Sequence, residues 1–269
     1  MFFTPKNSIL ELNSYNPNFG KSNANKLIRL SANENPLGCS PNILKEINLN
    51  ELNRYPPQHS DSLTESISQT FKIDKNKIIL GNGSDELISI IAQSFLNFND
   101  EAIYTEFGFL QFPQSIAIAG GKAIKAKDNE LTASVDNILA SINKKTRLIF
   151  LANANNPTGT FIPKSEVIRL VKSIPKNIIL VYDSAYAEYI DDTNYTDGIN
   201  LVEEYKNVVM LRTFSKLHGL AGLRLGWGYC CKEILNILMS VRGPFSVNSL
   251  AIKAGKIAIE DLDFQLKQI

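Results

Sequence analysis

The sequence predicts an α/β fold in which a mostly parallel central sheet has helices on both faces. Two patterns lead to this expectation. Short β-branched runs are typical of strands buried on both faces, and amphipathic segments of helical period lie between several of them. A third observation is the composition, because 269 residues with 44% apolar and 20% charged side chains suffice for a large globular core.

The charge balance and hydropathy exclude two other classes of protein. Lysine and arginine number 28 against 27 acidic residues, so no basic surface indicates nucleic-acid binding. No uninterrupted apolar run approaches the ~18 residues of a membrane span. We therefore expect a small-molecule partner, with neither nucleic acid nor membrane as a partner.

Five runs rich in Ile, Val and Leu are the predicted strands. In chain order they are residues 77–80, 101–105, 147–152, 177–183 and 207–213. Strands that alternate with helices favour parallel pairing, which brings the carboxyl ends of the strands to one edge of the sheet. Open α/β sheets bind their ligands at that edge.

Three segments are predicted helices. Residues 84–96 begin with Ser84 as the expected N-cap and carry two acids in the first turn. Residues 165–174 place their apolar side chains on one stripe, and Pro175 ends the helix. Residues 232–243 begin a helical tail.

The three cysteines predict a reduced, cytoplasmic setting without a structural metal. Cys39, Cys230 and Cys231 are odd in number and lack the spacing of metal ligands. The first residues, "MFFTPKNSILELNSYNP", lack the basic-then-apolar order of a secretory signal.

A glycine-rich loop follows the first predicted strand. In "IILGNGSDEL", Gly81, Gly83 and Ser84 lie between a strand and a helix, where backbone N–H groups and the helix dipole can bind a phosphate. A plain turn before a capped helix explains the loop equally well. It matches neither the P-loop nor the dinucleotide fingerprint, so a nucleotide is not the favoured ligand.

Two further motifs follow later strands. "LANANNPTG" contains strong turn formers and is either a simple turn or a rigid support that holds Asn156 over the sheet edge. Asp183 ends a buried strand, where a carboxylate is costly unless it has a partner. An isolated aspartate there would act as a helix cap. Tyr186, three residues on, can reach the same space.

"LRTFSKLHGLAGLRLGWG" (211–228) places Lys216 behind Thr213 and Ser215 and eight residues before Arg224. A lone lysine is most often a solvated charge. Here a lysine, an acid and a phosphate loop converge on one sheet edge. That set is what pyridoxal phosphate requires: an amine for the Schiff base, a carboxylate for the pyridine nitrogen, and donors for the phosphate.

Six motifs in this order give the chain a family resemblance. They are "SANENPLG" (31–38), "NRYPP" (53–57), "GNGSDE" (81–86), "NNPTG" (155–159), "DSAYAEY" (183–189) and "RTFSKLHGLAGLRLGWG" (212–228). Together they resemble the fold-type I pyridoxal phosphate-dependent aminotransferases, most closely the histidinol-phosphate aminotransferase branch.

The resemblance implies a role for each matching residue. Lys216 matches the lysine that forms the Schiff base and shuttles the proton, and Asp183 matches the partner of the pyridine nitrogen. Tyr186 and Asn156 match donors to the ring O3′, and Phe109 matches the aromatic ring that stacks on the cofactor. These roles make Lys216, Asp183 and Tyr186 the expected catalytic residues.

The remaining matches concern the phosphate, the substrate and a second subunit. The phosphate is expected at Gly83, Ser84, Asp85, Thr213, Ser215 and Arg224. Tyr55 matches a tyrosine that reaches the cofactor phosphate of the neighbouring subunit, which implies a homodimer. Asn33 matches a residue near the substrate.

The resemblance also implies domain boundaries and a departure. Residues 51–235 are expected to form the large cofactor-binding domain, and residues 1–50 to join a small domain that 236–269 begin. Related enzymes continue further and there supply the arginine that clamps the substrate carboxylate, so no residue here is assigned that role. We expect the apolar face of the tail around Ile252 and Ile257 to be partly uncovered.

Three functions stay open at this point. The first is transamination between histidinol phosphate or an aromatic amino acid and 2-oxoglutarate. The second is decarboxylation of a phosphorylated amino acid, and the third is a non-catalytic remnant that binds cofactor or a partner. An NAD-binding function is the least favoured, because no strand is followed by the dinucleotide glycine pattern.

Overall fold

The computed structural model describes residues 4–10, 12, 30–50, 52–57 and 61–269. Most of the opening segment that lacks the pattern of a secretory signal lies outside these residues. Its centre is a sheet in the order β1-β7-β6-β5-β4-β2-β3, in which β7 alone runs antiparallel to its neighbours. The strands are β1 (Ile78–Gly81), β2 (Glu101–Thr105), β3 (Lys122–Ala126), β4 (Thr146–Ala152), β5 (Ile179–Asp183), β6 (Val208–Thr213) and β7 (Gly226–Cys230). The predicted, mostly parallel sheet is confirmed.

The five predicted strands all form, and β3 and β7 are additional. β3 is an edge strand whose lysines face solvent, so it lacks the continuous apolar run of a central strand. β7 contains Gly226 and Gly228, which weaken a strand signal. A Cβ at Gly226 would lie 2.4 Å from the backbone N of Ser84. Glycine is therefore required where β7 passes the loop after β1.

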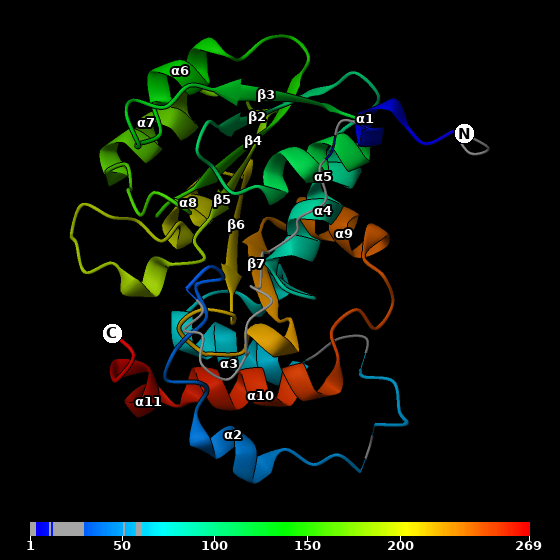
Figure 1. The fold of residues 1–269 in the computed structure, drawn as a ribbon, viewed down its shortest axis with the longest axis vertical. Coiled ribbons are helices and arrows are strands. Elements are labelled where there is room, and N and C mark those ends of the chain that lie inside the picture. The colour runs from blue at the N-terminus through cyan, green and yellow to red at the C-terminus, as the bar shows by residue number, and fades with distance from the viewer. Residues whose placement is uncertain (1–3, 11, 13–29, 51, 58–60) are drawn as a thin grey trace, which may run out of the picture.

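Helices cover both faces of the sheet (Figure 1). α4 (Ser84–Phe95), α5 (Gln111–Ala119) and α9 (Lys232–Val241) pack on one face, and α6 (Val135–Ala140), α7 (Lys164–Ser173) and α8 (Ile199–Glu204) on the other. Alternate strand residues supply the two cores: in β4, Leu148 and Phe150 face the first layer, while Ile149 and Leu151 face the second.

The predicted helices form as α4, α7 and α9, but Ser84 is not the N-cap of α4. Gly83 takes that position with φ 81°, and Ser84 is the first helical residue. The backbone at Gly83 lies in the region that favours glycine, and a Cβ there would come within 2.5 Å of Arg224 Nη2. The loop therefore needs glycine where a side-chain cap was expected.

A group of helices from both ends of the chain packs beside the sheet (Figure 1). It contains α2 (Pro41–Glu46), α3 (Asp61–Phe71), α10 (Ser249–Glu260) and α11 (Leu262–Leu266). The expectation of an uncovered apolar face on the tail is wrong for most of α10, because Ile252, Ala254 and Ile259 are buried against the core that includes Leu63 and Ile67 of α3. Ile257 is only partly buried.

Four short elements complete the described chain: α1 (Asn7–Leu10), η2 (Lys75–Lys77), η3 (Ala187–Tyr189) and η4 (Ala221–Leu223). None of the helices formed by the described residues has the length and apolar character needed to cross a membrane.

Candidate active site

A cavity of about 410 Å³ opens at the carboxyl ends of β4, β5 and β6 and beside the start of α4. It brings together ten of the twelve residues predicted to bind the cofactor. These are Ser84, Asp85, Phe109, Asn156, Asp183, Tyr186, Thr213, Ser215, Lys216 and Arg224. The position at the strand ends is where open α/β sheets bind ligands.

Lys216 lies on the loop after β6 and points into this cavity. Its Nζ donates hydrogen bonds to the carbonyl oxygens of Ala32, at 3.0 Å, and Asn33, at 3.4 Å, and lies 5.5 Å from the centroid of the Tyr186 ring. Burial lowers the pKa of the Lys216 amine, because desolvation disfavours its charged form. A lowered pKa makes the neutral, nucleophilic amine more accessible.

Asp183 is the buried acid of the cavity. Its side chain ends β5, only 4% of the residue is exposed, and burial raises its pKa to about 7. Oδ1 accepts a hydrogen bond from the Ala185 N–H at 3.0 Å, and no described residue donates to Oδ2. A buried carboxylate with a free oxygen facing a cavity fits a cationic partner such as a protonated pyridine nitrogen.

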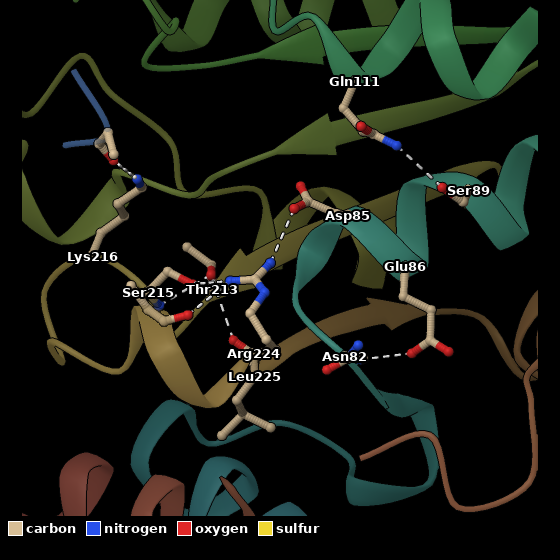
Figure 2. A network of polar contacts seen from close by, with 12 residues as sticks. Asn82, Asp85, Glu86, Ser89, Gln111, Thr213, Ser215, Lys216, Arg224 and Leu225 are labelled. Carbon is tan, nitrogen blue, oxygen red and sulfur yellow. Dashed lines mark hydrogen bonds and ion pairs between the residues drawn. The ribbon is translucent and has the colours of Figure 1, made fainter. Parts of the chain in front are cut away.

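Arg224 forms the anion-binding corner of the cavity together with the start of α4. Figure 2 shows its guanidinium between Ser215 and Asp85, with Nη1 donating to Ser215 Oγ at 3.2 Å and Nη2 to Asp85 Oδ2 at 3.0 Å. The hydroxyl of Thr213 lies beside them and accepts from the Ser215 N–H. An arginine, two hydroxyls and a helix N-terminus suit a phosphate group.

Gly83 does not line the cavity, but it makes room for this corner. A Cβ on Gly83 would lie 2.5 Å from Arg224 Nη2 and 3.2 Å from its Cζ. Arg224 itself has a left-handed backbone, with φ 52°. Gly83 therefore shapes the site through the space it leaves.

Tyr186 and Asn156 reach the cavity from the loops after β5 and β4. The Tyr186 hydroxyl accepts a hydrogen bond from Asn33 Nδ2 at 3.0 Å, and burial raises its pKa. The loop of Asn156 is held by its buried neighbour Asn155, which donates to the Phe107 carbonyl at 3.0 Å. Phe109 lines the cavity as well, as expected of a stacking ring.

The N-terminal loop contributes more than sequence patterns indicated. Ala32 and Glu34 line the cavity, and the Ala32 carbonyl accepts from Lys216. Their only sequence signal is the motif at 31–38. Asn35 fastens the loop, since its Nδ2 donates to the carbonyl oxygen of Leu217 at 2.9 Å.

Tyr55 lies outside the cavity of its own chain. Its side chain is on the surface, with 82% of the residue exposed, and its ring stacks on Phe245 with a centroid distance of 4.7 Å. The predicted role at a neighbouring subunit's cofactor stays a prediction.

Comparison with known proteins places these observations in a family. The family model for aminotransferase class I and II matches residues 25–269. Histidinol-phosphate aminotransferase of Maricaulis maris (strain MCS10) is 40% identical over 274 residues, covering 100% of this chain and 75% of that protein. The Pelagibacter ubique (strain HTCC1062) protein of the same name is 41% identical over 265 residues, covering 97% and 73%.

A solved structure supports the same fold. Histidinol-phosphate aminotransferase from Sinorhizobium meliloti, in complex with pyridoxal-5'-phosphate, superposes with a TM-score of 0.84 at 24% identity over 88% of this chain and 65% of that one. The chain thus spans 65% to 75% of the length of these relatives. It belongs to the pyridoxal phosphate-dependent family of class I and II aminotransferases.

Proposed function

We propose that this chain holds pyridoxal phosphate in the 410 Å³ cavity and transfers an amino group between histidinol phosphate, or an aromatic amino acid, and 2-oxoglutarate. The observation that carries the proposal is the convergence of Lys216, Asp183 and Arg224 on that one cavity. The names of the relatives that are about 40% identical favour histidinol phosphate as the amino donor.

When bound, pyridoxal phosphate supplies an aldehyde carbon that bonds to amines and a ring that accepts the electrons released as a proton leaves the substrate Cα. Lys216 would hold the aldehyde carbon through Nζ, and Nζ would take up and return that proton once a substrate amine has replaced it. The lowered pKa of Lys216 suits both tasks, because each needs a neutral amine.

The other residues bind and orient. Asp183 would pair with the pyridine nitrogen. This pairing would keep a proton on the ring and would give the buried carboxylate a cationic partner. Arg224, Thr213 and Ser215 would bind the phosphate together with the backbone N–H groups at the start of α4. Tyr186 would donate toward the ring oxygen O3′ with Asn156.

We also propose a homodimer in which Tyr55 reaches the cofactor phosphate of the partner subunit. The large exposure of Tyr55 and its position outside its own cavity support this role. Sedimentation of the purified protein measures the assembly. The three free cysteines support a reducing, cytoplasmic location.

The proposal is tested by trapping the cofactor on the protein. Protein loaded with pyridoxal phosphate should be yellow, and borohydride reduction followed by peptide mapping should place the pyridoxyl group on Lys216. Lys206, an exposed lysine paired with Glu233, should remain unlabelled as the internal control. A label on any lysine other than Lys216 would contradict the assignment.

A further inference from the structure

An ion-pair cluster around a buried arginine lies next to the cavity residue Thr213 in the chain and has no part in the function described so far. Arg212 is in β6, immediately before Thr213, and only 3% of it is exposed. Its Nη1 donates to Glu188 Oε1 at 2.9 Å and its Nη2 donates to Asp197 Oδ2 at 2.7 Å. We define Arg212, Glu188 and Asp197 as the Arg212 cluster.

The two acids of the cluster belong to one segment that carries an active-site side chain. This segment, residues 184–198, leaves β5 directly after Asp183 and contains Tyr186, with Glu188 in η3. Near its far end, the Asp197 carbonyl accepts a hydrogen bond from Ser184 Oγ at 2.8 Å. Arg212 therefore joins both parts of the segment to β6, the strand that leads to Lys216.

The surroundings of Arg212 strengthen these bonds. Its guanidinium lies over the aromatic rings of Phe71, at 4.9 Å, and Trp227, at 6.0 Å, so water is largely excluded on that side. Charged pairs interact more strongly in such a medium than in water, and breaking one pair leaves a poorly solvated charge. These contacts therefore tie the segment to β6.

Tyr186 and Lys216 depend on the same alignment. Tyr186 lies between Asp183 and Glu188 in sequence, and its ring is 5.5 Å from Lys216 Nζ. A displacement of the segment would move this ring away and admit water to the amine.

We propose that Arg212 is a positioning residue, which sets the place of Tyr186 relative to Lys216 through its ion pairs with Glu188 and Asp197. The inference rests on the proposed function only in assigning Tyr186 and Lys216 to one active site. The geometry of the Arg212 cluster does not depend on whether the chain catalyses transamination.

We expect the cluster to act on Lys216 mainly through position. The charged groups with the largest effect on the pKa of the Lys216 amine are Asp85 of α4, Glu34 of the N-terminal loop, Asp183 of β5 and Arg224. Neither member of the Arg212–Glu188 pair is among them. A change in Lys216 after substitution of this pair would therefore report a change in its surroundings.

The test measures the reactivity of Lys216 in protein prepared without cofactor. Acylation by acetic anhydride across a pH series, quantified on the Lys216 peptide by mass spectrometry, gives the pKa of the amine. The variants are Glu188→Gln, Arg212→Lys and Asp197→Asn, and thermal unfolding is recorded on the same samples. Asp197 is the most exposed member of the cluster, so its substitution is the mildest.

A matched control exists on the surface. Arg169 of α7 also joins two acids, Asp136 of α6 at 2.9 Å and Glu166 of α7 at 2.6 Å, but 41% of its side chain is exposed. Arg169→Lys removes an equivalent bidentate arrangement away from the cavity.

We expect the pKa of Lys216 to rise toward its ordinary value in the cluster variants, so that acylation below that pKa falls about threefold or more, the effect of half a pKa unit. Arg169→Lys should leave it unchanged. Cluster variants that remain folded, with Lys216 acylated as in the parent protein, would overturn the proposal and leave Arg212 a purely structural role. If the two buried substitutions prevent folding, Asp197→Asn decides in the same way. Because no substrate is used, a failed transamination would not affect the result.

Discussion

Asp183 couples folding to pH because its environment favours the neutral acid. In the folded protein burial raises its pKa to about 7, against an ordinary value of 3.8. Between these two values the folded state binds more protons than the unfolded state, so the free energy of unfolding falls as pH rises. The contribution of Asp183 to the free energy of unfolding is fully present below about pH 4 and is lost as the pH rises through about 7.

This coupling predicts a difference between the parent protein and Asp183→Asn, both without cofactor. Asparagine has the same shape and no titratable group. Between pH 4 and pH 8 the free energy of unfolding of the parent should therefore fall by roughly 2–4 kcal/mol relative to that of the variant. Urea unfolding at several pH values measures the difference, and titrations elsewhere cancel in it. Asp136→Asn, at an exposed acid, should track the parent. Parallel curves for the parent and Asp183→Asn would show that the buried acid does not titrate as described.

At this scale, local motifs were sufficient to locate Lys216, Asp183 and Arg224, because Asp183 ends a predicted strand and the other two belong to the motif at 211–228 that begins in another. The bond from Lys216 to Ala32 spans 184 positions and leaves no local pattern. The ion pair between the Asp85 carboxylate and Arg224 was also not predicted, since the resemblance placed both residues only at the phosphate. Side-chain pairing across a cavity depends on three-dimensional placement that periodicity does not encode.

The turn between β1 and α4 is the element on which the phosphate corner depends. Gly83 has a backbone that disfavours other residues, and a Cβ there would strike the Arg224 guanidinium. Gly83→Ala should therefore displace Arg224 and weaken the binding of pyridoxal phosphate about tenfold or more, with roughly 1–2 kcal/mol of added backbone strain.

Equilibrium binding of pyridoxal phosphate followed by fluorescence, together with urea unfolding, measures both effects. Gly222→Ala is the control, because Gly222 is in η4 near the same arginine, has no neighbour within 4 Å of an added Cβ and needs no special backbone. Equal affinity of the two variants would mean that the Arg224 position is not set by this turn.

The same turn shows why some elements were predicted and others were not. The strands with continuous apolar runs, such as β4 and β6, were read correctly because burial on both faces leaves a direct mark on composition. β7 was not predicted because it contains glycines, which weaken a strand pattern but are needed where a neighbouring loop approaches closely. Ser84 was wrongly predicted as the N-cap of α4 for a related reason. Gly83 takes the N-cap position because a side chain there would occupy the space of Arg224.

In the whole molecule, helices from the two ends of the chain meet in one core. Gly255 of α10 lies against Leu225 and Leu63, and a Cβ there would come within 2.4 Å of Leu225 Cδ2. Ser66 Oγ of α3 donates to Glu260 Oε1 of α10 at 2.6 Å. The fold class was predictable from alternating strands and helices, whereas this packing joins segments as much as 194 positions apart. The domain divisions near residues 50 and 235 stay a prediction.

The shared core predicts that damage to α3 spreads to the sheet. Leu63 is fully buried, so Leu63→Ala should lower the free energy of unfolding by about 2–5 kcal/mol. Trp227 in β7 is the only tryptophan, and its ring lies 5.2 Å from that of Phe71 in α3. Its fluorescence and far-UV circular dichroism should show the same shifted midpoint in urea.

Leu44→Ala is the control for this prediction, because Leu44 of α2 is 77% exposed. Its midpoint should stay within error of the parent. Separate transitions for the two probes in Leu63→Ala would instead mean that the helices unfold independently of the sheet.

The described cations that line the cavity bear on how a substrate carboxylate is oriented. Among the described residues that line it, Lys216 and Arg224 carry positive charge, and the proposed function assigns both to the cofactor. No third cation among these described lining residues is left to pair with a substrate carboxylate and orient the Cα–H bond over the ring. We expect the chain by itself to bind pyridoxal phosphate but to react slowly with glutamate.

A single-turnover experiment that follows the absorbance of the lysine-bound cofactor measures this rate. Lys216→Ala, which cannot form the bond to the cofactor, gives the baseline. Rapid and complete conversion of the cofactor by this chain would show that another group orients the carboxylate, and the assignment of both cations to the cofactor would then be wrong.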